Sequence, residues 1–179
     1  GVRLVGSEMC IRDRSLGSIV KGMGTSEFLI HIVEQYLTPG MVPALVFLFG
    51  ALISFSTGSS WGVWSIMMPI AFPMAIAFDI SIPFVVGAVI GGGLFGDQCS
   101  PISDTTVLSS TGASCNHIVH VMTQLPYGIT VGISAFVGFL FGGLTGQYVL
   151  SIAVTAAILT VSLITLTQLT KRRYPEKVH

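Results

Sequence analysis

Two aspartates, Asp97 and Asp104, stand seven positions apart in the stretch GGGLFGDQCSPISDTT, which covers residues 91–106. Apolar sequence flanks this stretch on both sides, and no Lys or Arg stands near either carboxylate in the sequence. Acidic side chains in such an apolar setting are costly to keep and by default indicate a functional site. A carboxylate offers oxygen ligands to a hard cation and also takes up a proton. The chemistry that these residues could do is therefore to exchange a cation for protons.

A second stretch of similar composition is STGSS at residues 56–60, which also interrupts an apolar segment. We call residues 56–60 the first break and residues 96–106 the second break. Small and hydroxyl-bearing side chains compete for the backbone's hydrogen bonds, so both breaks are expected to unwind a helix. A pair of interrupted helices is typical of a transporter's binding site. We expect the two breaks to lie at similar membrane depth and to face each other across a polar cavity.

These residue types predict an ion-binding site. Asp97 follows a glycine and has no helix start to serve, so it is the predicted primary exchange site. Asp104 precedes two threonines and is predicted to cap a short helix that begins at Thr105, and to act as a co-ligand. The other predicted ligands are hydroxyl side chains of the two breaks: Thr57, Ser59, Ser60, Ser100, Ser103 and Thr105. Helix N-termini after the breaks would instead favour an anionic group, so the residues alone predict an ion-coupled carrier without fixing the ion.

The elements that must hold these residues are helices in a lipid bilayer. Of the 179 residues 51% are apolar and only 9% are charged, and the mean hydropathy is +0.83. Ordinary soluble chains have about 25% charged residues. Because about 20 apolar residues cross the hydrocarbon core, we expect an all-α protein with several membrane-spanning helices. The net charge is near zero and no basic patch occurs, which argues against a nucleic-acid partner. The three cysteines form no CxxC pair. No cofactor is expected.

The apolar segments predict where the helices run. One broken crossing is expected from Leu45 to Pro69, with the first break in its middle. An apolar, glycine-rich segment follows over residues 82–95, and full-length spans are expected over residues 125–146 and 149–169. Asp79 is expected in an interfacial loop and residues 116–124 in a polar surface segment.

The two ends of the chain differ from its apolar centre. Residues 1–15 are charged and without period, and we interpret them as a scar or a truncation edge outside the fold. A mildly amphipathic helix is expected over residues 16–37. The basic tail, residues 171–179, follows the last span directly, so the positive-inside rule predicts a cytoplasmic C-terminus.

Four segments resemble the C-terminal part of NhaC-type Na⁺/H⁺ antiporters: LGSIVKGMGTSEFL, ALISFSTGSSWGVWSIMMPIA, GGGLFGDQCSPISDTTVLSSTGAS and NHIVHVMTQLPY. The resemblance runs from about Ser15 to Gln168. It implies a secondary transporter, not an enzyme, in the cell membrane of a prokaryote, built as an inverted repeat with discontinuous or hairpin helices and exchanging Na⁺ for H⁺. Asn116 and Val119 stand where the resemblance predicts acids, which weakens a role for that segment in pH sensing. Position 98, a Gln here, is variable among relatives.

The resemblance also implies that residues 16–170 are the C-terminal half of a carrier. A full member is more than twice this length, so the missing N-terminal half is the implied partner of this chain, with an oligomer possible. Each polar group left without a partner in lipid costs several kcal/mol, so the chain alone is expected to insert poorly or to be inactive.

Three alternatives stay open. A Na⁺- or H⁺-coupled exchanger of organic anions, of the malate/lactate type, is the nearest, but no Arg or Lys stands between Lys21 and Lys171 to pair with a carboxylate substrate. An intramembrane aspartyl protease also uses two aspartates, but Leu94 replaces the first Gly of its GxGD element and both aspartates share one segment. A structural membrane subunit would not need carboxylates in broken helices.

Overall fold

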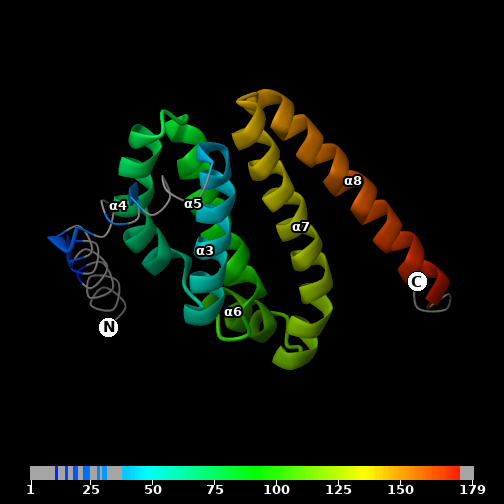
Figure 1. Ribbon diagram of the computed structural model, residues 1–179. Coiled ribbons are helices and arrows are strands. Elements are labelled where there is room, and N and C mark those ends of the chain that lie inside the picture. The colour runs from blue at the N-terminus through cyan, green and yellow to red at the C-terminus, as the bar shows by residue number, and fades with distance from the viewer. Residues whose placement is uncertain are drawn as a thin grey trace.

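The computed structural model describes residues 38–173 and several positions between Ile11 and His31. Figure 1 shows that residues 38–173 form helices joined by short turns. They are the 3-10 helix η1 (Pro39–Met41) and the α-helices α3 (Val42–Thr57), α4 (Ser60–Ala77), α5 (Ile82–Cys99), α6 (Asp104–Gly112), α7 (His117–Thr145) and α8 (Tyr148–Arg173). No strand occurs among these residues. Five helical segments are long and apolar enough to span a membrane, which confirms the prediction of an all-helical, multi-span protein.

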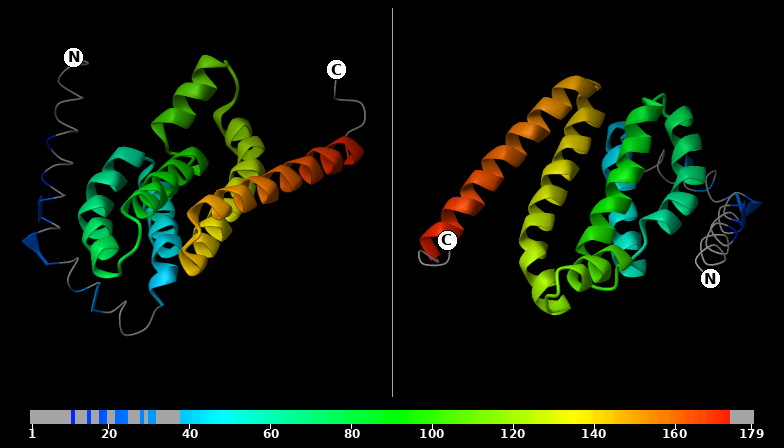
Figure 2. Two further views of the ribbon diagram at one scale, coloured as in Figure 1. Left: turned by 90° about the horizontal axis from the view of Figure 1, so that it is seen from above. Right: turned by 180° about the vertical axis from the view of Figure 1, so that it is seen from behind.

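The helices alternate in direction. In Figure 1, α3 runs down, α4 up and α5 down, while α7 runs up and α8 down again. Helix α5 packs against α3, α4 and α7 and so lies at the centre of the bundle. Helix α8 packs mainly on α7, and the right view of Figure 2 shows it apart from α3 to α5. Only 6% of the 18-residue apolar stretch of α8 is buried, against 44% of that of α5, so α8 lies at the edge of the bundle.

The first break is a helix hairpin, which corrects the prediction of a single crossing from Leu45 to Pro69. Helix α3 ends at Thr57 and α4 begins at Ser60, so two residues make the turn. Gly58 adopts the left-handed conformation with φ 67°, and its N–H donates to the Ser54 carbonyl oxygen. A glycine in this conformation ends a helix at little steric cost, and the chain then reverses instead of continuing through the membrane.

Helix α7 also begins earlier than expected. The segment 116–124, predicted to be a polar surface segment, forms the N-cap and first two turns of α7. The Asn116 side chain accepts the Ile118 N–H at 3.0 Å, and this bond starts the helix at His117. Asp79 lies in the exposed turn between α4 and α5, which confirms the predicted loop, while its place at the membrane interface stays a prediction. The expected helix over residues 16–37 lies largely, and residues 1–15 almost entirely, outside the described residues.

The contact between α3 and α5 positions the second break. A Cβ added at Gly92 would meet the carbonyl oxygen of Phe47, and one added at Gly96 would meet that of Ala51, so the two backbones touch at both levels. The buried Ser54 hydroxyl donates to the Gly93 carbonyl oxygen at 2.6 Å. Glycine has no side chain, so it allows such close approach between membrane helices. Their association in lipid depends on dispersion and hydrogen bonding and not on the hydrophobic effect. The C-terminal end of α5 is thereby held against α3.

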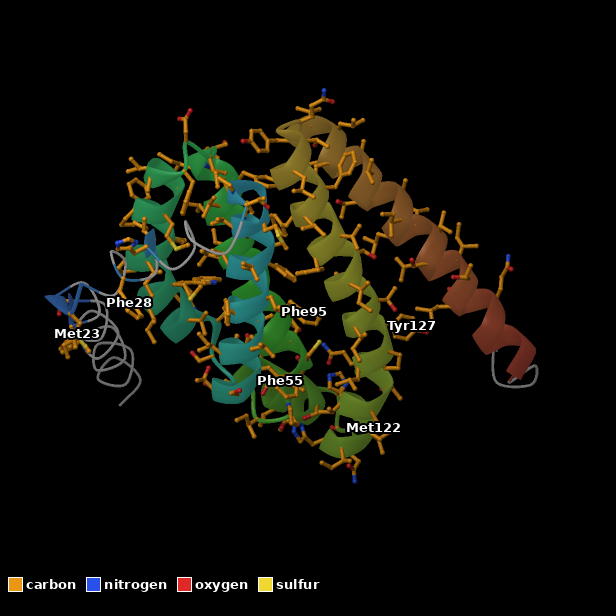
Figure 3. The ribbon with its side chains drawn as sticks, in the orientation of Figure 1. Met23, Phe28, Phe55, Phe95, Met122 and Tyr127 are labelled. Atoms are coloured by element: carbon orange, nitrogen blue, oxygen red, sulfur yellow. The ribbon has the colours of Figure 1, made fainter. Side chains whose placement is uncertain are left out.

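Aromatic rings fill the remaining space between α5 and α7. Phe95 of α5 points toward α7, where its ring packs on Gly132, and it lies 6.0 Å from the ring of Phe47 (Figure 3). Phe47 also lies 5.4 Å from the ring of Phe139 on α7. These contacts join α3, α5 and α7 into one layer just above the second break.

Candidate functional site

Asp97 is the buried acid of the second break. It lies in the last turn of α5 with 4% of its surface exposed. The Ser103 hydroxyl donates to its Oδ1 at 2.7 Å, and the Thr105 hydroxyl lies 3.3 Å from its Oδ2. No Lys or Arg side chain occurs in residues 38–168, so within this part of the chain the polar partners of the carboxylate are hydroxyls and not cations. A buried carboxylate of this kind is costly unless something compensates it.

The two hydroxyls leave one carboxylate oxygen weakly held. Ser103 Oγ and Thr105 Oγ1 lie 2.7 Å apart, and each hydroxyl has one hydrogen to give. Because Ser103 gives its hydrogen to Oδ1, the Thr105 hydrogen is shared between Ser103 Oγ and the more distant Oδ2. Asp97 Oδ2 is therefore the oxygen that can most easily accept a cation or a proton.

The residues from Ser100 to Ser103, which we call the 100–103 loop, bring Ser103 back over Asp97. Ser100 is fully buried and ends α5, with its N–H donating to the Gly96 carbonyl oxygen at 3.0 Å. Its side-chain oxygen accepts the Ile102 N–H at 3.4 Å, and its carbonyl accepts the Ser103 N–H at 3.4 Å. This tight turn is why a serine six positions after Asp97 can reach it.

Asp104 is not the helix cap that the sequence predicted. Ser103 stands at the N-cap of α6, where its oxygen accepts the Thr105 N–H at 3.2 Å. Asp104 is the first residue of α6 and is exposed. The shift of one residue follows from the 100–103 loop, which places the Ser103 side chain between Asp97 and the start of α6. The ligand role of Asp104 stays a prediction.

The first break touches the second through its backbone. A Cβ at Gly58 would lie 2.8 Å from the Ile102 carbonyl oxygen, so the hairpin turn packs directly on the 100–103 loop. The predicted neighbourhood of the two breaks is thus present, although at this point they are packed together without an intervening cavity. Thr57 is exposed and donates to the Ile53 carbonyl oxygen of its own helix. Ser59 is half-buried and Ser60 is buried. In the described part of the chain, Asp97 is hydrogen-bonded to none of the three first-break hydroxyls, those of Thr57, Ser59 and Ser60.

Sequence reasoning missed the buried face of α6. Ser103, Thr106 and Ser110 are all buried, at 0, 3 and 2% exposure. Their spacing of three and four residues puts them on one side of a helix, a signal that the sequence does contain. The Thr106 hydroxyl has no hydrogen-bond partner among the described residues, which is uncommon for a buried polar group. It adds a free oxygen on the side of α6 that packs inward.

Sequence comparisons with known proteins identify several relatives of this chain. A protein of Haemophilus influenzae, itself uncharacterised, is 44% identical over 149 residues, which are 82% of this chain and 28% of the relative. An uncharacterised Na⁺/H⁺ antiporter of the same organism is 32% identical over 71% of this chain and 27% of its own length. The malate-2H⁺/Na⁺-lactate antiporter of Bacillus subtilis is 30% identical over 72% of this chain and 28% of its own length.

The chain thus spans little more than a quarter of the curated relatives that it matches. No solved structure matches it. The sequence model of the Na⁺/H⁺ antiporter family matches residues 14–144, a segment that holds both breaks and most of α7. The chain therefore belongs to the Na⁺/H⁺ antiporter family, whose members are membrane transporters rather than enzymes.

Proposed function

We propose that this chain carries the ion-exchange site of a carrier that moves Na⁺ in one direction and H⁺ in the other, with Asp97 binding the two ions in turn. The observation that carries the proposal is a buried carboxylate whose polar partners, among the residues that the structure describes, are hydroxyls and not cations. A Lys or Arg partner would neutralise Asp97 permanently, whereas hydroxyls leave its charge available. Oxygen ligands of this kind suit a hard cation.

The geometry supports competition between the two ions at one oxygen. With Asp97 ionised, the Thr105 hydrogen can turn fully to Ser103 Oγ, 2.7 Å away, which frees Oδ2 for Na⁺. The hydroxyl oxygens of Thr105 and Ser100, and the free oxygen of Thr106, are further candidate ligands. With Asp97 protonated, the carboxyl carries no charge and the cation leaves. Because both ions need the same carboxylate, they exchange rather than bind together.

The whole carrier would provide what this chain lacks. We assign residues 16–170 to the C-terminal repeat of an inverted-repeat transporter in a prokaryotic cell membrane, with residues 171–179 as a cytoplasmic tail and residues 1–15 outside the fold. The α3–α4 hairpin and the interrupted α5–α6 segment are the elements that such a repeat would place at the ion path. Asp104 and the first-break hydroxyls Thr57, Ser59 and Ser60 would complete the site from the side that faces the other repeat.

A second candidate substrate is an organic anion, because the Bacillus relative is named for malate and lactate exchange. The absence of any Lys or Arg from residues 22–170 favours a cation as the ion bound at Asp97. Vesicles that contain the whole protein distinguish the two. Proton movement driven by Na⁺ alone supports Na⁺/H⁺ exchange, whereas movement that requires malate or lactate supports the organic-anion exchanger.

Ser103→Ala tests the hydroxyl partners of Asp97. It removes the hydrogen bond to Oδ1 and the N-cap of α6, and loss of a hydrogen bond that orients a metal ligand costs about 10–100-fold in metal affinity. We expect the Na⁺ concentration for half-maximal exchange to rise about tenfold in vesicles loaded with a pH-sensitive dye. Ser109→Ala is the matched control, since that hydroxyl lies on the same helix, is exposed and donates to the Thr105 carbonyl oxygen. Equal behaviour of the two variants would contradict the site.

A further inference from the structure

The ring of His117, the first residue of α7, joins the second break to the buried face of α6. Its Nε2 lies 2.7 Å from the Pro101 carbonyl oxygen, and its Nδ1 lies 3.1 Å from the Ser110 hydroxyl. Pro101 belongs to the 100–103 loop, which carries Ser103 onto Asp97. Through this ring α7 holds the 100–103 loop at Pro101. The turn at Gly58 packs on the next residue of the loop, Ile102.

The partners of the ring fix where its hydrogens lie. A carbonyl oxygen only accepts, so Nε2 must carry a hydrogen and donate it to Pro101. The Ser110 hydroxyl has one hydrogen and two acceptors within reach, His117 Nδ1 and the Val107 carbonyl oxygen at 2.9 Å. When the ring is neutral, Ser110 donates to Nδ1. When the ring is an imidazolium, Nδ1–H donates to the Ser110 oxygen, whose hydrogen then turns to Val107.

The bond to Pro101 consequently persists in both charge states without movement of any heavy atom. The other titratable side chains on the elements packed at this end are Asp97 and Cys99 of α5, Asp104 of α6, Cys115 of the α6–α7 turn and His120 of α7. None of them is hydrogen-bonded to the His117 ring in the part of the chain that the structure describes. Within the described residues, the hydrogen-bond partners of the ring are thus a carbonyl and a hydroxyl, both neutral.

We propose that His117 is a positioning residue for ion exchange, which holds the 100–103 loop so that Ser103 stays on Asp97 over the whole pH range in which the carrier works. This inference rests on the proposed role of Asp97 and adds to it a residue from another helix that is not hydrogen-bonded to the carboxylate. A carrier that exchanges protons needs its ion ligands to keep their places while the proton concentration changes. A histidine whose second partner can either donate or accept meets that need.

Substitutions at position 117 separate this role from a general structural one. A Gln side chain brings its amide nitrogen to the place of Nε2 and can still donate to Pro101, whereas the shorter Asn reaches only the Nδ1 place and Ser110. In vesicles containing the whole protein, we expect His117→Ala and His117→Asn to raise the half-saturating Na⁺ concentration about tenfold, with a smaller change in maximal rate. His117→Gln should restore the affinity to within about twofold of the original. His120→Ala, one turn along the same helix, should leave it unchanged.

A measurement independent of transport tests the bond itself. The ¹⁵N chemical shifts of the His117 ring, assigned by their loss in His117→Gln, report which nitrogens carry hydrogen. We expect Nε2 to carry a hydrogen in the neutral ring as well as in the charged ring. A neutral ring with its hydrogen on Nδ1, or an Asn variant as active as the Gln variant, would overturn the proposal. Retained exchange in Asp97→Asn would instead remove the proposed function, whatever the spectra show, so the two failures are distinct.

Discussion

Asp97→Asn is expected to abolish Na⁺-dependent proton movement in the whole protein while leaving its insertion and amount in the membrane normal. The amide keeps the size of the side chain, and its oxygen can still accept the hydrogen bond that Ser103 donates to Oδ1 at 2.7 Å. It cannot carry the negative charge that Na⁺ needs, nor take up the proton that displaces Na⁺. Dye quenching in vesicles should fall to the level of membranes without the carrier.

Asp104→Asn is the matched control for this experiment. Asp104 is exposed at the first turn of α6 and is not the cap, so its loss should cost at most part of the Na⁺ affinity. A carboxylate in the first turn of a helix contributes about 0.3–1 kcal/mol through the helix dipole. Near-normal exchange with an unshifted pH profile in Asp97→Asn would show that another group binds the ions. Complete loss in Asp104→Asn alone would assign the exchange to Asp104.

Gly96→Ala is expected to be the most damaging small substitution in the helix bundle. Its methyl group would meet the Ala51 carbonyl oxygen and lie 2.6 Å from the Ser54 Cβ and 2.7 Å from the Phe55 nitrogen. Most of these atoms are backbone, which cannot turn aside, so α3 and α5 would have to separate. Overpacking a well-packed interface costs about 1–3 kcal/mol, and we expect a loss at the upper end of that range in the free energy of unfolding. Thermal unfolding of the purified protein in detergent measures it.

Gly87→Ala provides the comparison on the same helix. No atom lies within 4 Å of a Cβ built at Gly87, so alanine fits there and gains up to about 1 kcal/mol of helix propensity. Its unfolding temperature should be unchanged or higher. Because Gly96 directly precedes Asp97, the Gly96 variant should also lose Na⁺ affinity. A Gly96→Ala protein as stable as the Gly87→Ala protein would contradict the close approach of α3 and α5.

The site was predictable where it depends on neighbours in sequence. Asp97 is the candidate that the sequence singles out, because a carboxylate in an apolar segment without Lys or Arg demands an explanation, and the structure shows that it is buried. Ser103 and Thr105 follow it closely enough to reach it through one turn, and both are hydrogen-bonded to it or within reach. The cap was misplaced by one residue because the sequence does not reveal how tightly the 100–103 loop closes. Both Ser103 and Asp104 are favourable caps, and the geometry of the loop decides between them.

The remainder depends on contacts between distant segments or on the direction of the chain. The sequence shows that residues 56–60 interrupt a helix. Small and hydroxyl-bearing residues occur both where a helix kinks and where the chain reverses, so composition does not tell the two apart. The left-handed conformation of Gly58 does. Thr57 has the chemistry of a ligand, yet its hydroxyl bonds to the carbonyl of Ile53. His117 had no visible partner because Pro101 lies 16 positions earlier.

The packing of Gly58 on Ile102 also has a consequence for how such carriers can diverge. Surface loops ordinarily absorb insertions and deletions. Here a two-residue turn and a four-residue loop support each other through backbone atoms, so a residue added to either would displace both and move Ser103 away from Asp97. Length changes between relatives should therefore collect elsewhere, for instance at Gly146 between α7 and α8, where nothing lies within 4 Å of an added Cβ. The gap pattern of an alignment would then identify the ion path without any transport measurement.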